Sequence, residues 1–208
     1  MMTAAFILSF MLPIFAPTDE GDKRPDLQAL VPQIRSLEDA MRSGSDKEAE
    51  ESALELMRLA GQLDGGNDTS EAIRISREIL HRPSPAKARR QAFAILSKWV
   101  PQEVASEVTT VKINGPHTTC WGRFQDALDE RLLSANDWIL KARAHNTHRS
   151  RGGPNTFGTI AGLEFVLDRS KSANDLIQAL KKAGFDLRSW TIMVETPIAE
   201  YEKNSASK

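Results

Sequence analysis

The chain has 208 residues, of which 40% are hydrophobic and 26% are charged, and its formal net charge at pH 7 is −1. These values are ordinary for a globular protein and exclude a polyelectrolyte chain. The charge is nevertheless uneven: residues 17–82 carry 9 Lys and Arg against 15 Asp and Glu, whereas residues 83–155 carry 11 against 6. The basic middle region could bind an anionic partner, or it could complement the acidic region within one fold.

The N-terminal 16 residues are an apolar segment that contains no Lys, Arg, Asp or Glu. Its uncharged run, residues 3–16, is shorter than the roughly 20 residues that a membrane-spanning helix needs, but it suits the hydrophobic part of a secretory signal. The lack of a preceding Lys or Arg, and Pro17 after the expected cleavage site, argue against a standard signal peptide. The segment therefore predicts a secreted, periplasmic or membrane-associated protein, or else a cytoplasmic one that packs these residues against itself or a partner.

Residues 26–100 are predicted to form an antiparallel array of four helices, after a linker at 17–25. Apolar residues recur every three or four positions in four segments, which is the period of an amphipathic helix. The segments are separated by short stretches rich in Gly, Pro, Ser and Asp, which stop and start helices. Short connections favour antiparallel neighbours.

The remainder of the chain is predicted to be helical with one short extended or β element, so that the fold class is mainly α. Residues 101–122 form an extended connector, in which alternating Val and Ile residues indicate a strand at about 107–113. Residues 123–200 form a C-terminal helical domain, with a long helix at 123–144, a basic loop at 145–155 and further helices at 157–168 and about 171–184. Residues 201–208 are a tail.

Four basic residues around the basic loop are the candidate polyanion-binding site. Phosphate groups could be held by a helix end and the following Arg- and Gly-containing loop. The alternative is a solvated helix end, where cations are favoured because the helix dipole is negative there, followed by an exposed loop. The four residues are Lys141, Arg143, Arg149 and Arg151.

Two closely spaced pairs, His117 with Cys120 and His145 with His148, are the candidate metal site. Histidine nitrogen and cysteine sulfur are zinc ligands, and zinc is the only cofactor that the sequence suggests. A straight helix at 123–144 would keep the pairs about 30 Å apart, so the site would need a broken helix or a dimer. The alternative is that the histidines lie at helix ends and that the cysteine is an inert small hydrophobic residue.

No nucleotide-binding, hydrolase or metalloprotease motif occurs in the sequence, and a cysteine–histidine catalytic pair at 117–120 lacks an orienting third group. The sequence therefore predicts a non-enzymatic helical binding or structural protein, exported or membrane-associated. Its expected partner is another protein or a second copy of itself, with a membrane as a further partner through residues 3–16. The alternative is a cytosolic nucleic-acid-associated protein that uses residues 83–155.

Overall fold

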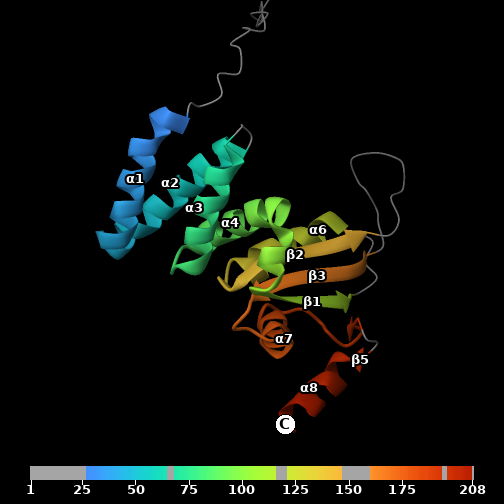
Figure 1. Ribbon diagram of the computed structural model, residues 1–208. Coiled ribbons are helices and arrows are strands. Elements are labelled where there is room, and N and C mark those ends of the chain that lie inside the picture. Colours follow the sequence, from blue (N-terminus) through green and yellow to red (C-terminus); the bar gives the residue numbers. More distant parts are fainter. Residues whose placement is uncertain (1–26, 65–67, 116–120, 147–159, 194–195, 208) are drawn as a thin grey trace, which may run out of the picture.

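The computed structural model describes residues 27–64, 68–115, 121–146, 160–193 and 196–207 (Figure 1). The apolar segment 1–16 and the linker 17–25 lie outside these residues. Within the described part of the chain, no helix combines the length and the apolar character that crossing a membrane requires.

The four N-terminal helices confirm the prediction of a helical array. Consecutive helices contact one another, and α2 also contacts α4, which makes a layer of antiparallel neighbours (Figure 1). Their apolar stripes meet in one core that includes Leu56, Leu59, Ile75 and Leu96, each no more than 2% exposed. The helices are α1 (Leu27–Ser43), α2 (Asp46–Asp64), α3 (Thr69–His81) and α4 (Ala86–Trp99).

The prediction of a C-terminal helical domain with one short extended element is wrong. The described residues contain a five-stranded antiparallel sheet. The expected strand at 107–113 is present, but the expected helix at 123–144 stops at Leu133 and is followed by a strand. The described part of the expected helix at 157–168 is a strand. The elements are α5 (Pro101–Ala105), β1 (Val108–Asn114), α6 (Trp121–Ala127), the π-helical turn η1 (Leu128–Leu133), β2 (Ile139–Asn146), β3 (Ile160–Asp168), α7 (Ala173–Lys182), β4 (Thr191–Ile192), β5 (Thr196–Pro197) and α8 (Ile198–Ala206).

Local composition and a register shift explain why β2 resembled a helix in the sequence. Ala, Lys, Leu and Arg, which fill much of β2, are intrinsically good helix formers. The pairing of β2 with β3 also shifts register between Ile139 and Lys141, so the alternation of buried and exposed residues is interrupted. Packing of the strand against its neighbours outweighs these local preferences.

The sheet has a recognisable topology. Its strand order is β2-β3-β1-β4-β5, and every paired neighbour is antiparallel. Along the chain, β1, the helix formed by α6 and η1, then β2, β3, α7 and β4 follow one another. This is the β-α-β-β-α-β order of the split β-α-β, or ferredoxin-like, arrangement. The fold is therefore a helical array joined to an α+β unit.

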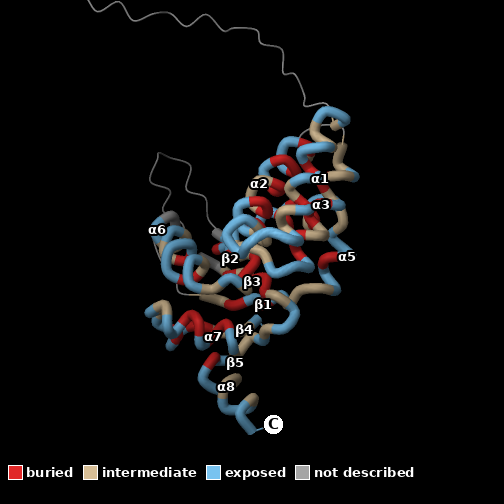
Figure 2. The backbone as a smooth tube through the Cα atoms, turned by 90° about the vertical axis from the view of Figure 1, so that its left-hand side faces the viewer, coloured by how far each residue is buried: buried red, intermediate tan, exposed pale blue. Residues whose placement is uncertain are grey.

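One face of the sheet is covered by α6, η1 and α7. Residues of β3 that point to this face, Leu163, Phe165 and Leu167, are at most 1% exposed and belong to a second core. Leu128 of η1 and Ile177 of α7 fill the same core. Figure 2 shows the two groups of buried residues, one among α1–α4 and one where α7 meets the strands.

On the opposite face of the sheet, the described residues provide cover at one end. There, Leu140 and Val166 are buried in the core of the helical array. Arg90 of α4 reinforces this junction, because its guanidinium donates to the backbone carbonyls of Leu133, Asn136 and Ile139 at 2.7–2.9 Å. The helical array therefore leaves the other end of this face open.

Candidate functional site

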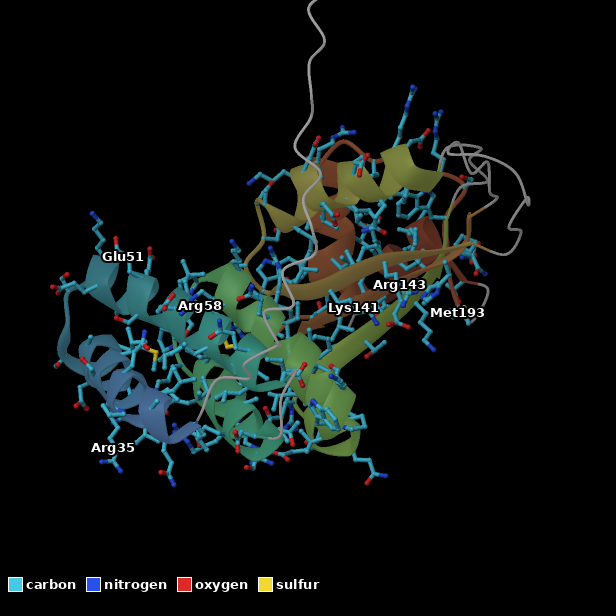
Figure 3. All side chains as sticks on the ribbon, turned by 90° about the horizontal axis from the view of Figure 1, so that it is seen from above. Arg35, Glu51, Arg58, Lys141, Arg143 and Met193 are labelled. Carbon is cyan, nitrogen blue, oxygen red and sulfur yellow. The ribbon has the colours of Figure 1, made fainter. Side chains whose placement is uncertain are left out.

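The open end of the sheet face carries a group of charged side chains. Alternation along β2 and β3 puts Lys141, Arg143 and His145 on the same side as Glu164, because Ala142, Ala144, Leu163 and Phe165 point into the core. Figure 3 shows Lys141 and Arg143 on the side of β2 opposite to α6. Lys112 of β1 completes the group. These five residues, Lys112, Lys141, Arg143, His145 and Glu164, are called the cationic sheet face below.

Strand register places Glu164 at the centre of the cationic sheet face. It lies directly opposite Lys112 of β1 on one side and Arg143 of β2 on the other. Residues directly opposite each other in an antiparallel pair have Cβ atoms about 5 Å apart, so the three side chains form a row across three strands. Opposite charges in such a row stabilise the sheet and fix its register.

The carboxylate of Glu164 is held in its ionised form. Lys141 Nζ donates a hydrogen bond to Glu164 Oε1 at 2.6 Å, and His145 Nε2 lies 3.7 Å from Oε2. The hydrogen bond from Lys141 lowers the pKa of Glu164 most, and the charges of Lys141, His145 and Lys112 lower it further, whereas partial burial raises it. The net effect is a pKa below the ordinary value of a glutamate.

The positive charge of the cationic sheet face exceeds its negative charge. Three Lys and Arg side chains surround a single carboxylate, and Lys141 already forms the ion pair with Glu164. Lys112 and Arg143 are exposed, and within the described residues neither makes an ion pair with an acidic side chain. In the described part of the chain, these two cations are therefore the ones left for an anionic partner.

A hollow of about 390 Å³ adjoins the charged row. Gly162 lies in its lining, and a Cβ added at this position would make only an ordinary van der Waals contact, with the Ile113 carbonyl oxygen at 3.9 Å, so a side chain fits there without a clash. Met193, which is 54% exposed, lies in the same lining. The site thus combines cations, one carboxylate and an accessible apolar side chain.

The structure places the predicted polyanion-binding residues differently from the sequence-based expectation. Lys141 and Arg143 are strand residues, so the explanation that they neutralise a helix C-terminus is wrong. Arg149 and Arg151 lie outside the described residues. Lys112 and Glu164 were missed; the alternation of Leu163, Phe165 and Leu167 around Glu164 was a signal for a strand that could have found the latter.

Of the predicted metal ligands, only His145 belongs to the described residues, and its described partner is Glu164. His117, Cys120 and His148 lie outside them. Among the residues that are described, no three His, Cys, Asp or Glu side chains are grouped as a metal would require.

A second hollow, of about 330 Å³, lies where the helical array meets the sheet. Its charged lining is largely paired: Arg89 Nη2 lies 2.5 Å from Asp168 Oδ2, and His81 Nε2 lies 3.4 Å from Glu107 Oε2. The Arg89–Asp168 pair joins α4 to the end of β3. We therefore assign this hollow to the junction of the two parts.

The fold and the cationic sheet face define an α+β protein with an open, charged sheet surface. No protein family matches the chain, and no curated protein or solved structure is significantly similar to it.

Proposed function

We propose that the protein is a non-enzymatic binding protein whose cationic sheet face contacts an acidic segment of a protein partner. The observation that carries the proposal is the cross-strand row of Lys112, Glu164 and Arg143 next to the exposed Met193. Arg and Met are enriched in protein–protein interfaces, and an accessible apolar side chain beside complementary charges is typical of such surfaces.

The central carboxylate favours an acidic protein segment over a nucleic acid. A nucleic-acid backbone carries a charge at every phosphate, and Glu164 in the middle of the row would repel it. A protein segment can place a carboxylate against Lys112 or Arg143 and an apolar or basic side chain against the remaining surface. The hollow beside Met193 offers room for one such side chain.

The state of Glu164 supports binding rather than acid–base catalysis. A catalytic base or acid works best with a pKa near the operating pH. Hydrogen bonding from Lys141 moves the pKa of Glu164 in the opposite direction, so this carboxylate is a weak proton acceptor at neutral pH. Its role in the proposal is to fix the positions of the surrounding cations.

Fluorescence anisotropy with two labelled probes tests the proposal: a ten-residue peptide in which glutamate alternates with alanine, called the glutamate peptide, and a thymidylate decanucleotide. We expect the glutamate peptide to bind more tightly than the oligonucleotide, and its affinity to fall as salt rises. The double variant Lys112→Ala/Arg143→Ala should weaken peptide binding about tenfold, since each exposed ion pair is worth up to ~1 kcal/mol. Gly162→Leu, which fills the hollow but keeps every charge, should also weaken it.

The matched control is Arg35→Ala, which removes an exposed cation from α1, far from the sheet (Figure 3). This variant should bind the glutamate peptide as the wild type does. Tighter binding of the oligonucleotide, lost in the double variant, would replace the proposal with a nucleic-acid-binding function. An equal loss in Arg35→Ala and in the double variant would remove the cationic sheet face from consideration.

A further inference from the structure

The outer edge of β1 is only partly paired. On one side, β3 accompanies β1 from Val108 to Ile113. On the other side, β4 pairs with Ile113 and Asn114 alone, and the chain then turns back into β5. Residues 108–111 therefore have no strand on this side among the described residues, and an unpaired edge offers backbone donors and acceptors to another chain.

The direction of the backbone groups on this edge follows from one hydrogen bond. The Met193 N–H donates to the Lys112 carbonyl at 3.0 Å, so the backbone groups of Lys112 point toward β4. In an antiparallel strand these directions alternate from residue to residue. The N–H and C=O of Thr110 therefore lie in the plane of the sheet and point away from β3, toward the unpaired side, whereas those of Thr109 point toward β3.

The unpaired edge lines a groove, a hollow of about 790 Å³. The hollow is lined by residues 109–112 of β1, by residues 171–173 at the start of α7, and by Ile192, Met193 and Tyr201. Because β4 already pairs with the end of this edge, residues 108–111 are the ones left to pair among the described residues, and this short length suits a short extended segment better than the edge strand of a second sheet. Lys112 and Lys171 add positive charge to an otherwise largely apolar surface.

We propose that this groove binds an extended, acidic peptide segment of a partner protein, which adds as a strand antiparallel to β1 in line with β4. Backbone hydrogen bonds to Thr110 supply affinity, as in other cases of strand addition to a sheet edge. Lys112 and Lys171 line the hollow and attract carboxylates at the ends of the segment, for which the Lys171 amine leaves its place over the Trp138 ring, 5.7 Å from the ring centroid. Ala173, Ile192 and Tyr201 contact the apolar side chains of the segment. This site adjoins the cationic sheet face and shares Lys112 and Met193 with its surroundings, but it does not rest on the function proposed for that face.

The test uses a labelled seven-residue peptide in which threonine and valine alternate between two terminal glutamates. Thr110→Pro removes the outward N–H, a change that an edge strand tolerates. We expect this variant to bind the peptide at least tenfold more weakly, whereas Thr110→Val, which keeps the N–H, should bind it as the wild type does. Lys171→Glu should weaken binding of this peptide and strengthen binding of a version with terminal lysines.

Binding of the glutamate peptide to the cationic sheet face should persist in Lys171→Glu, which separates failure of this site from failure of the proposed function. Hydrogen exchange of the wild-type protein provides a measurement independent of any variant, because the seven-residue peptide should slow exchange of the Thr110 amide. Unchanged exchange at Thr110, or equal peptide affinity in Thr110→Pro and Thr110→Val, would overturn the proposal. A wild-type dimer that Thr110→Pro converts to a monomer would also overturn it, in favour of a second copy as the occupant.

Discussion

At the scale of single residues, the ionised carboxylate of Glu164 holds the surrounding cations of the cationic sheet face in place and thereby stabilises the fold. Its carboxylate accepts a hydrogen bond from Lys141 and lies opposite Lys112 and Arg143 in the strand register. Protonation of Glu164 would remove the negative charge that holds these cations together. The same contacts that lower its pKa must therefore stabilise the folded protein whenever the group is ionised.

The first prediction concerns the pH dependence of this contribution. Since the folded-state pKa of Glu164 is lowered, its stabilisation is fully present above the unfolded value of about 4.3 and is lost as the pH falls through the folded value. We expect Glu164→Gln to be less stable than the wild type at pH 7, and the difference to shrink below about pH 4. Urea unfolding at several pH values measures this difference.

Glu51→Gln on α2 is the matched control, because Glu51 is 67% exposed and lies 3.8 Å from Lys47. Exposed pairs of this kind contribute little to stability, so this variant should follow the wild type at every pH. If the free energies of unfolding of Glu164→Gln and the wild type differed by the same amount at every pH from 7 to 3, this result would contradict the assigned role of the Glu164 charge.

At the scale of elements, the periodicity of the sequence is sufficient to predict the helices α1–α4 but not the strands β2 and β3. The four helices follow from their own apolar stripes, because each packs with one face toward the array. In β2, Ile139 and Ala142 are spaced like residues of a helix, and the register shift hides the alternation. In β3, Val166 is buried against the helical array, so that the strand is apolar on both faces at that end.

The candidate site was predictable only in part for the same reason. Lys141 and Arg143 stand out in the sequence because basic residues are concentrated around them. Lys112 and Glu164 become neighbours only through the pairing of β1 with β3, and nothing local to either residue specifies that partner. Strand pairing between distant segments depends on the whole core, which a periodicity within one segment does not encode.

The second prediction concerns the start of α7, whose helix was correctly predicted. Ser172 Oγ accepts a hydrogen bond from the Asp175 N–H at 3.3 Å, and the Asp175 carboxylate accepts one from the Ser172 N–H at 2.8 Å. This reciprocal pair is a capping box, which satisfies backbone donors that the first helical turn leaves free. Ser172→Ala should lower the free energy of unfolding by about 1 kcal/mol, as measured by urea denaturation.

Ser189→Ala is a suitable control for this prediction, because Ser189 is an exposed serine outside any helix or strand. It should change the free energy of unfolding by no more than about 0.5 kcal/mol. Equal stability of Ser172→Ala and Ser189→Ala would show that the capping box does not stabilise α7 measurably.

At the scale of the whole molecule, two cores share the sheet. Leu140 and Val166 lie on its strands but belong to the core of the helical array, whereas their neighbours Ile139, Phe165 and Leu167 belong to the core beneath α7. The Arg89–Asp168 pair and the bonds from Arg90 reinforce the same junction. Because the cores are joined through single strands, we infer that the array and the sheet unfold together.

The last prediction tests this coupling through Arg90. Its guanidinium is half-buried, burial lowers its pKa, and it donates to three backbone carbonyls of the segment that joins η1 to β2. Arg90→Ala leaves these carbonyls without their donor and should lower the free energy of unfolding by about 2–4 kcal/mol.

The control is Arg58→Ala, which removes an exposed cation of α2 that is paired with Glu55 of the same helix α2. It should lower the free energy of unfolding by no more than about 0.5 kcal/mol. Circular dichroism and tryptophan fluorescence should report one coincident transition in the wild type and in both variants, because Arg90 reinforces a junction that Leu140 and Val166 also hold. A cost below about 1 kcal/mol for Arg90→Ala would contradict its role, and two separate transitions in the wild type would show that the array and the sheet are independent units.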